Sequence, residues 1–330
     1  MAHRDPTLVS PFAPLIESLV ASKRSHGYSY EATLYELGRF DRFCAETGVS
    51  SPELGRDLVA AWSEPMGTEG AATREGRVSA VRQLALHMLS LGLDAYVPRG
   101  FCGRGRTVPY VPTDAEVIAL LAVADAYAEA GAPASCRWCS WMWLEWPVAF
   151  RLMWCCGLRI SECANMRVED VSIGGATLAI RHSKGDKDRL VYMAPDVAEM
   201  MGAYLADVAR ELGHESEWAF PGAKPGRHVS KGLFCHKFQM FWDQTPAAKK
   251  SSKRPTPHSL RHAFVVRRIN AWAEQGVDVE SMLPFLSGYL GHAGPSETYY
   301  YYHQTIDAIR LVRDVDRVCL RVIPGVVDDG

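Results

Sequence analysis

Apolar residues recur at three- and four-residue spacing through most of the first hundred positions of the chain. This spacing is typical of helices that bury one face, and it predicts helices over residues 11–25, 30–48 and 73–92. The last two segments end at glycine, a frequent helix terminator, and strand-like alternation is absent from this part of the sequence. We therefore expect a small, all-helical domain over residues 1–97.

A segment rich in proline, glycine and arginine follows this domain. Residues 96–112 contain three of each. Because proline and glycine both interrupt regular hydrogen-bonded structure, we expect a linker over residues 98–112. The linker arginines suit either contact with a phosphate backbone or simple solvation. They are Arg99, Arg104 and Arg106.

The second domain, residues 113–330, begins with Thr113 and Glu116 at the spacing of a helix-opening capping box. After further helical segments, short stretches rich in β-branched residues predict a small antiparallel sheet. These stretches are residues 168–173, 176–183 and 189–195. Helical spacing returns afterwards and dominates to the C-terminus. The predicted fold is mainly α with a small antiparallel β-sheet, in which a helical domain precedes an α+β domain.

The bulk composition, with 48% hydrophobic and 22% charged residues, is ordinary for a globular protein. The most apolar run, residues 141–158, contains Glu145, Pro147 and Arg151, so it predicts a buried helix or helix pair rather than a membrane span. Nine cysteines and an N-terminus without a secretion signal predict reduced thiols in a bacterial cytoplasm. The cysteines lack zinc-like spacing, so we expect no metal and no other cofactor.

Basic residues concentrate in one stretch, although the net charge of the whole chain is −2. Residues 222–270 hold eleven lysines and arginines against one acid, Asp243. Such an excess of positive charge repels itself unless a polyanion neutralises it, and a phosphate backbone is the obvious partner. The candidates for backbone contact are Lys224, Arg227, Lys231, Lys249, Lys250, Lys253 and Arg254.

Side chains suited to phosphodiester chemistry occur in four places along the second domain. They are Arg159 with Glu162, Lys184 at a hairpin tip, His258 with Arg261, and His292 followed by Tyr299 to Tyr302. The arginine–glutamate and histidine–arginine pairs are each three residues apart, which places both members on one side of a helix. Each feature alone is more often structural: arginine beside glutamate usually forms a salt bridge, and a run of tyrosines usually packs.

Together these groups supply the functions that cleavage of a phosphodiester requires. Two arginines bind the non-bridging oxygens and stabilise the extra charge of the transition state. A tyrosine phenol attacks phosphorus, and a lysine protonates the departing deoxyribose oxygen. Two histidines hydrogen-bond the phosphate and assist proton movement at the nucleophile.

The ordered series Arg, Lys, His-x-x-Arg, Leu-Gly-His and Tyr resembles the tyrosine recombinase (phage integrase) family over residues 113–310, and the helical domain resembles that family's core-binding domain. In this family the nucleophile usually follows the Leu-Gly-His histidine by nine positions, which implies Tyr301, with Tyr300 or Tyr302 as alternatives. Lys187 and Arg189 are further basic residues close to Lys184 in the sequence, within or beside the hairpin. The implied catalytic residues are Arg159, Lys184, His258, Arg261, His292 and Tyr301, supported by Glu162.

The resemblance implies a site-specific DNA recombinase of the integrase or transposase type, acting through a covalent 3′-phosphotyrosine intermediate. It implies double-stranded DNA with an inverted-repeat core site as partner, and a homotetramer assembled from protomers that are monomeric or dimeric when free. The alternatives are a nicking-closing activity like that of type IB topoisomerases, without strand exchange, and a non-catalytic DNA-binding protein. The segment 305–323, with helical spacing, docks on a neighbouring protomer or folds back on its own.

Overall fold

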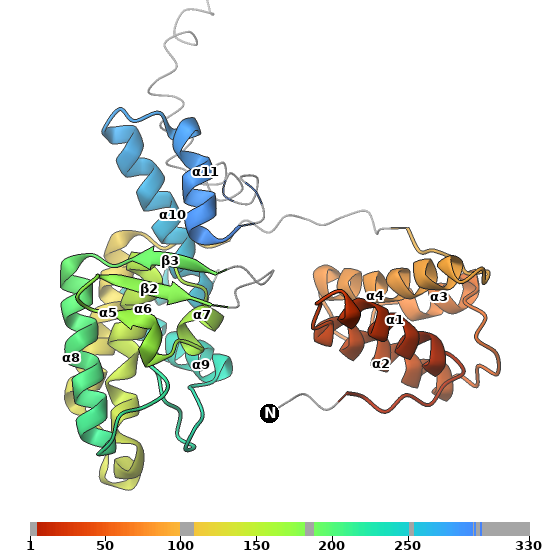
Figure 1. The fold of residues 1–330 in the computed structure, drawn as a ribbon, viewed down its shortest axis with the longest axis horizontal. Helices are drawn as coiled ribbons and strands as arrows, with labels where there is room; N and C mark the ends of the chain where they lie inside the picture. The colour runs from red at the N-terminus through yellow and green to blue at the C-terminus, as the bar shows by residue number, and fades with distance from the viewer. Residues whose placement is uncertain are drawn as a thin grey trace, which may run out of the picture. The chain divides into compact units, whose positions relative to one another are not determined.

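The computed structural model describes residues 5–99, 109–181, 188–250 and 254–292, together with Gly294 and Thr298. The chain divides into two compact units, Met1–Thr107 and Val108–Gly330, coloured red to orange and yellow to blue in Figure 1. Each unit has a hydrophobic core of its own, as an independently packed domain requires.

The N-terminal unit is mainly helical in its described residues. Its helices are α1 (Ala13–Ser25), α2 (Glu31–Glu46), α3 (Arg56–Ser63) and α4 (Ala71–Ser90). The core they enclose is aromatic at its centre, because the Phe40 ring lies 5.4 Å from the rings of both Phe12 and Trp62. Arg77 is fully buried, and its guanidinium stacks 4.6 Å from the Trp62 ring and forms an ion pair with Glu69. Such pairing is what makes burial of a charge tolerable.

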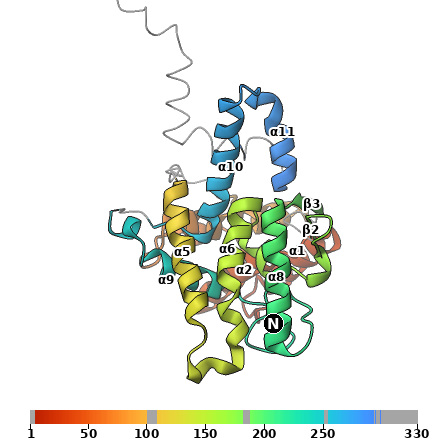
Figure 2. The ribbon, with the colours of Figure 1, turned by 90° about the vertical axis from the view of Figure 1, so that its left-hand side faces the viewer.

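The C-terminal unit is built around α6 (Glu145–Cys156), most of whose residues are buried. This helix packs most extensively against three others, and Figure 2 shows two of them, α5 (Asp114–Ala130) and α8 (Pro195–Leu212), beside it. The other helices of the unit are α5 (Asp114–Ala130), η1 (Ala134–Trp143), α7 (Ile160–Ala164), α8 (Pro195–Leu212), α9 (Lys231–Trp242), η3 (Pro246–Lys249), α10 (Pro257–Glu274) and α11 (Val279–Leu290). The third neighbour of α6 is α10, which itself packs with α11.

Three short strands form an antiparallel sheet within the described residues. They are β1 (Val171–Ser172), β2 (Thr177–Ile180) and β3 (Arg189–Tyr192), in the spatial order β1-β2-β3, and the short helix η2 (Val168–Asp170) leads into them. Leu178 pairs with Val191 in register, and both side chains are fully buried against the helices. Ile180 pairs with Arg189, so regular pairing of β2 with β3 ends there.

The predicted fold class is confirmed: the described chain is mainly helical with a small antiparallel sheet. The sequence did not indicate α3, which at eight residues is too short to show a clear helical period. The tryptophan-rich segment before α6 is also not one regular helix, since η1 has non-helical backbone at Cys136 and Cys139. None of the helices described in the structure combines the length and apolar composition that crossing a membrane requires.

Candidate active site

The turn between α6 and α7 fixes the position of Arg159. Helix α6 ends at Cys156, and Gly157 closes it in the left-handed conformation at a φ of +66°. Arg159 is the N-cap of α7, and its backbone N–H donates to Oε2 of Glu162 at 2.9 Å. The two side chains form an ion pair on one side of this first turn, as their spacing predicts, but Arg159 is the capping residue that precedes the helix and not a residue within it.

The carboxylate of Glu162 joins several arginines. Its Oε1 accepts from Nη1 of Arg159 at 2.8 Å, and Arg189 donates to both oxygens, at 2.9 and 2.7 Å. Nη1 of Arg261 lies 3.8 Å from Oε2. The Glu162 side chain is only 4% exposed. Burial opposes ionisation of this carboxyl, but the ion pair and hydrogen bonds from Arg189 prevail and hold its pKa at about 2. Glu162 is therefore ionised at neutral pH.

Arg261 connects the ends of two helices from the interior of α10. Its side chain is 1% exposed. Nη1 donates to the carbonyl of Gly157 at 2.7 Å, and Nη2 donates to the carbonyl of Leu290 at 2.7 Å. The backbone carbonyls at the C-terminal ends of helices carry partial negative charge, which favours a cation there. The guanidinium thus holds the ends of α6 and α11 together.

The end of α11 gives Arg159 its second fixed contact. Gly291, at a φ of +65°, follows the helix, and its carbonyl accepts from Nη2 of Arg159 at 2.8 Å. A Cβ at this position would lie 3.1 Å from Nη1 of Arg189 and 3.5 Å from Nη1 of Arg159. Glycine satisfies both the positive φ and the close approach of the two guanidinium groups.

His292 is held from both ring nitrogens. Nη2 of Arg261 lies 3.0 Å from Nε2 of His292, and because a guanidinium only donates, Nε2 is the acceptor. The proton of the neutral ring therefore resides on Nδ1, which donates to Oγ1 of the buried Thr298 at 2.8 Å. In this arrangement the histidine orients Arg261.

The histidines of this region are neutral at physiological pH. Burial lowers the pKa of His258 to about 4, and the cations of Arg261 and Arg159 add to the effect. Burial and the Arg261 cation likewise lower the pKa of His292 to about 3. His262, whose ring lies 4.5 Å from that of His258, also has a pKa of about 3, because of burial and the neighbouring His258.

The structure brings together most of the predicted catalytic residues that it describes. Arg159, Glu162, Arg261 and His292 form one connected network, and His258 lies three residues before Arg261 in the first turn of α10. Lys184 and Tyr301, with the rest of the tyrosine run, lie outside the described residues.

The sequence interpretation missed Arg189 as a member of this network. Arg189 begins β3, directly after the hairpin, and its Nε donates to the carbonyl of Tyr289 at 2.7 Å in addition to its bidentate bond with Glu162. Its side chain is only 9% exposed. Its position beside the hairpin is the feature of the sequence that could have identified it. The sequence interpretation treated Arg189 only as a further basic residue close to Lys184.

The predicted contacts to a DNA backbone are exposed wherever the structure describes them. These residues are Arg99 in the N-terminal unit, and Lys224, Arg227, Lys231, Lys249, Lys250 and Arg254 in the C-terminal unit. Arg254 forms an ion pair with Asp243, the single acid of the basic stretch. Arg104, Arg106 and Lys253 lie outside the described residues.

The network of Arg159, Glu162, Arg189, Arg261 and His292 is suited to binding a phosphate group, and above all the trigonal-bipyramidal transition state in which the phosphate carries extra negative charge. Among the described residues that form it, Arg159, Arg189 and Arg261 outweigh the single negative charge of Glu162, and the histidines are neutral. An excess of positive charge held rigidly by backbone carbonyls stabilises charge that develops on phosphate oxygens.

The Phage integrase family matches residues 117–307, which is more than half of the chain, and the chain belongs to this family. The tyrosine recombinase XerD of Agrobacterium fabrum is 26% identical over 322 residues, covering 92% of this chain and 91% of that protein. The recognition made from the motifs in the sequence is confirmed.

Solved structures have the same fold. The Tn1549 transposon integrase in complex with circular intermediate DNA has a TM-score of 0.61 at 15% identity, covering 93% of this chain and 99% of that one. A lambda integrase dimer bound to a core site has a TM-score of 0.59 at 17% identity, covering 88% and 94%.

Replacement of Glu162 by glutamine should lower the stability of the C-terminal unit by about 3 kcal/mol at pH 7, because the pKa of the carboxyl falls from 4.5 to about 2 on folding. A lowered pKa stabilises the fold above pH 4.5, and this contribution is lost as the pH falls toward 2. The difference between wild type and Glu162→Gln in urea unfolding should therefore shrink over that range.

Glu217→Gln is the matched control, because it removes the carboxylate of an exposed ion pair with Arg167. Its effect should stay below about 1 kcal/mol. A Glu162→Gln variant as stable as wild type at pH 7 would show that the carboxylate does not hold the arginines together.

Proposed function

We propose that this protein is a site-specific DNA recombinase of the integrase type, which cleaves and rejoins DNA strands through a covalent 3′-phosphotyrosine. The observation that carries the proposal is the placement of Arg159 and Arg261. They come from chain segments about a hundred residues apart, yet both contact Glu162 and the backbone at the end of α11. Two guanidinium groups held in this way can bind the non-bridging oxygens of a single phosphate.

In the cleavage step, the phenol oxygen of Tyr301 attacks phosphorus and forms a P–O bond, while the bond from phosphorus to the 5′-oxygen breaks. Lys184 gives a proton to the departing 5′-oxygen, because an alkoxide is a poor leaving group. His258 assists removal of the phenol proton, and His292 orients Arg261 through the bond between them. Arg159 and Arg261 stabilise the charge of the pentacovalent transition state.

The rejoining step reverses this chemistry with a different strand. The free 5′-hydroxyl of the partner DNA attacks the phosphotyrosine, so the bond energy is retained and no nucleotide cofactor is consumed. We assign four protomers to two core sites with inverted repeats, and we assign the reaction to a mobile element in the bacterial cytoplasm. By analogy of fold, the lambda integrase dimer supports binding of more than one protomer at a core site, and the Tn1549 transposon integrase supports the assignment to a mobile element.

Two compact units suit a protein that closes around a duplex. We assign residues 1–97 to a core-binding domain, 98–112 to a linker and 113–330 to the catalytic domain. The exposed lysines and arginines between α8 and α10 support contact of the catalytic domain with the DNA backbone. A surface groove of about 580 Å³ lined by Trp154, Phe264 and Phe285, in which Phe285 is 72% exposed, supports contact between protomers.

Replacement of Tyr301 by phenylalanine should abolish the covalent adduct with core-site DNA, because phenylalanine has no hydroxyl to attack phosphorus. Phenylalanine at Tyr299, Tyr300 or Tyr302 should leave adduct formation in place. The adduct is measured by denaturing electrophoresis of labelled DNA after quenching with detergent. A covalent adduct that persists in Tyr301→Phe would assign the nucleophile to another residue.

Binding of DNA should be accompanied by proton uptake at pH 6. The pKa of His258 is about 4 in the free protein because of burial and the cations of Arg261 and Arg159. A phosphate anion beside these arginines offsets their charge and raises the pKa, so binding should tighten as the pH falls from 7 toward 5. Calorimetry of the Tyr301→Phe variant in buffers of different ionisation enthalpy measures the uptake.

His258→Gln in the same background should reduce this proton uptake by about half or more, whereas His214→Gln, at an exposed position after α8, should leave it unchanged. Proton release on binding, or uptake that is equal in all three proteins, would place the phosphate away from His258.

A further inference from the structure

Three successive backbone carbonyls at the C-terminal end of α11 each accept a hydrogen bond from a different arginine. The pairs are Tyr289 with Arg189, Leu290 with Arg261 and Gly291 with Arg159, at 2.7, 2.7 and 2.8 Å. The carbonyls at this end of a helix carry partial negative charge, which favours nearby cations. Arg159 and Arg261 bind the phosphate in the proposed reaction, and the further contacts of Arg189 indicate a different role.

Arg189 is paired with Glu162 through both carboxylate oxygens. Its Nη1 donates to Oε1 at 2.9 Å and its Nη2 donates to Oε2 at 2.7 Å. Nη1 of Arg261 lies 3.8 Å from the same Oε2, beyond the length of a direct hydrogen bond, and donates to the carbonyl of Gly157. Arg189 therefore occupies the carboxylate oxygen that Arg261 would otherwise reach.

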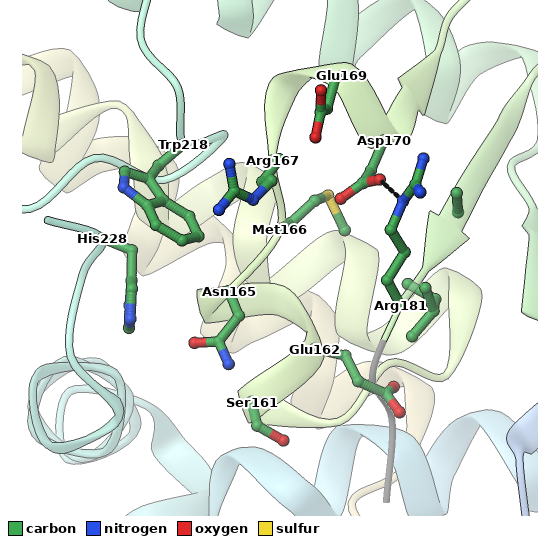
Figure 3. Close-up of a pocket in the computed structure, with 12 residues that line it drawn as sticks. Ser161, Glu162, Asn165, Met166, Arg167, Glu169, Asp170, Arg181, Trp218 and His228 are labelled. Atoms are coloured by element: carbon green, nitrogen blue, oxygen red, sulfur yellow. Dashed lines mark hydrogen bonds and ion pairs between the residues drawn. The ribbon is translucent and has the colours of Figure 1, made fainter. Parts of the chain in front are cut away.

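The register of the sheet directs Arg189 toward Glu162. Arg189 pairs with Ile180, which is 3% exposed, and side chains directly opposite each other in a sheet lie on the same face. Arg181 follows Ile180 and so projects from the opposite face, because successive side chains of a strand alternate. Figure 3 shows Arg181 turned toward Asp170, to which its Nε donates at 2.5 Å. The two arginines beside the hairpin thus serve different carboxylates.

Loss of Arg189 would change the charge balance of the network. Among the described residues that form it, three arginines against one glutamate leave an excess of two positive charges, and without Arg189 the excess falls to one. The Glu162 side chain is only 4% exposed, so water cannot readily replace the lost partner. Oε2 would instead draw Nη1 of Arg261 from 3.8 Å to direct pairing distance. That pairing would hold the charge of Arg261 on the carboxylate and away from a phosphate.

From these contacts we propose that Arg189 is a positioning residue for DNA cleavage. It neutralises Glu162, so that the other two arginines keep their place and their charge for the scissile phosphate. Arg189 acts through the carboxylate and does not itself touch the phosphate. The proposal rests on the proposed recombinase function, and it assigns Arg189 to the chemical step and not to DNA binding.

The test measures the rate of covalent adduct formation in a single turnover with saturating protein at pH 8, well above the ordinary glutamate pKa of about 4.3. Arg189→Met should slow this rate by about 10- to 100-fold, which is less than the loss of a direct donor to the phosphate costs. The protein concentration that half-saturates the DNA should stay within about twofold of the wild-type value, because the residue does not contact DNA.

The double variant Arg189→Met with Glu162→Gln separates neutralisation of the carboxylate from packing. It restores the excess of two positive charges, so it should form the adduct at least about fivefold faster than Arg189→Met alone. Replacing both partners of a buried ion pair also destabilises a fold less than leaving one partner behind. A purely structural role of Arg189, or direct contact with the phosphate, predicts a double variant as slow as Arg189→Met or slower.

Arg189→Gln keeps amide donors beside the carboxylate and is the second variant if methionine disturbs folding. It should show the same slowing and the same recovery with Glu162→Gln. The matched control is the pair of Arg151 with Asp125 between α5 and α6, which has the same two-bond geometry at 2.7 Å. Arg151→Met, alone or with Asp125→Asn, should leave the rate within about twofold of wild type.

A double variant no faster than Arg189→Met overturns the inference, and so does an Arg189→Met protein that cleaves at the wild-type rate. Arg261→Gln separates this failure from failure of the proposed function. If Arg261→Gln loses adduct formation while Glu162→Gln fails to rescue Arg189→Met, the inference alone is wrong. If Arg261→Gln cleaves at the wild-type rate, Arg261 does not act on the phosphate, and both the proposed mechanism and the inference are wrong.

Discussion

The ionised carboxylate of Glu162 is the group on which the arrangement of the site depends. Arginine side chains that approach one another repel, and burial removes the water that would screen them. Glu162 contacts Arg159, Arg189 and Arg261 at distances from 2.7 to 3.8 Å, and these contacts keep it ionised despite its burial. One negative charge thus allows several positive charges to remain close together, and the excess is available to a phosphate.

Backbone carbonyls at helix ends also hold the arginine side chains in place. The carbonyls of Gly157, Leu290 and Gly291 each accept from a guanidinium of Arg159 or Arg261. Gly157 and Gly291 both have positive φ. A Cβ at Gly157 would collide with the Phe264 ring at 2.6 Å, and a Cβ at Gly291 would crowd the Arg189 guanidinium at 3.1 Å. The site is therefore a consequence of where α6 and α11 end, and the packing of α10 against α6 brings those two ends to Arg261.

The sequence predicted the parts of the site that depend on local spacing. The His-x-x-Arg pair lies on one helix, and helices α5 and α8 follow their apolar periodicity, because each side chain's face is set within one element. Arg189 and the glycine carbonyls were missed, because their roles arise from contacts between segments that are 100 residues apart in the chain for Arg189 with Tyr289 and 132 residues apart for Arg159 with Gly291. Spacing carries no information about such contacts. The role of Arg159 as a helix cap was also missed, since the end of α6 depends on a single glycine.

The proposed mechanism requires Arg159 and Arg261 to act on one phosphate. The most direct measurement is an experimental structure of the Tyr301→Phe protein bound to uncleaved core-site DNA. Guanidinium nitrogens of both residues should lie within about 3.2 Å of non-bridging oxygens of the same scissile phosphate. Guanidinium groups bound to two different phosphates, or one of them turned away from the DNA, would contradict it.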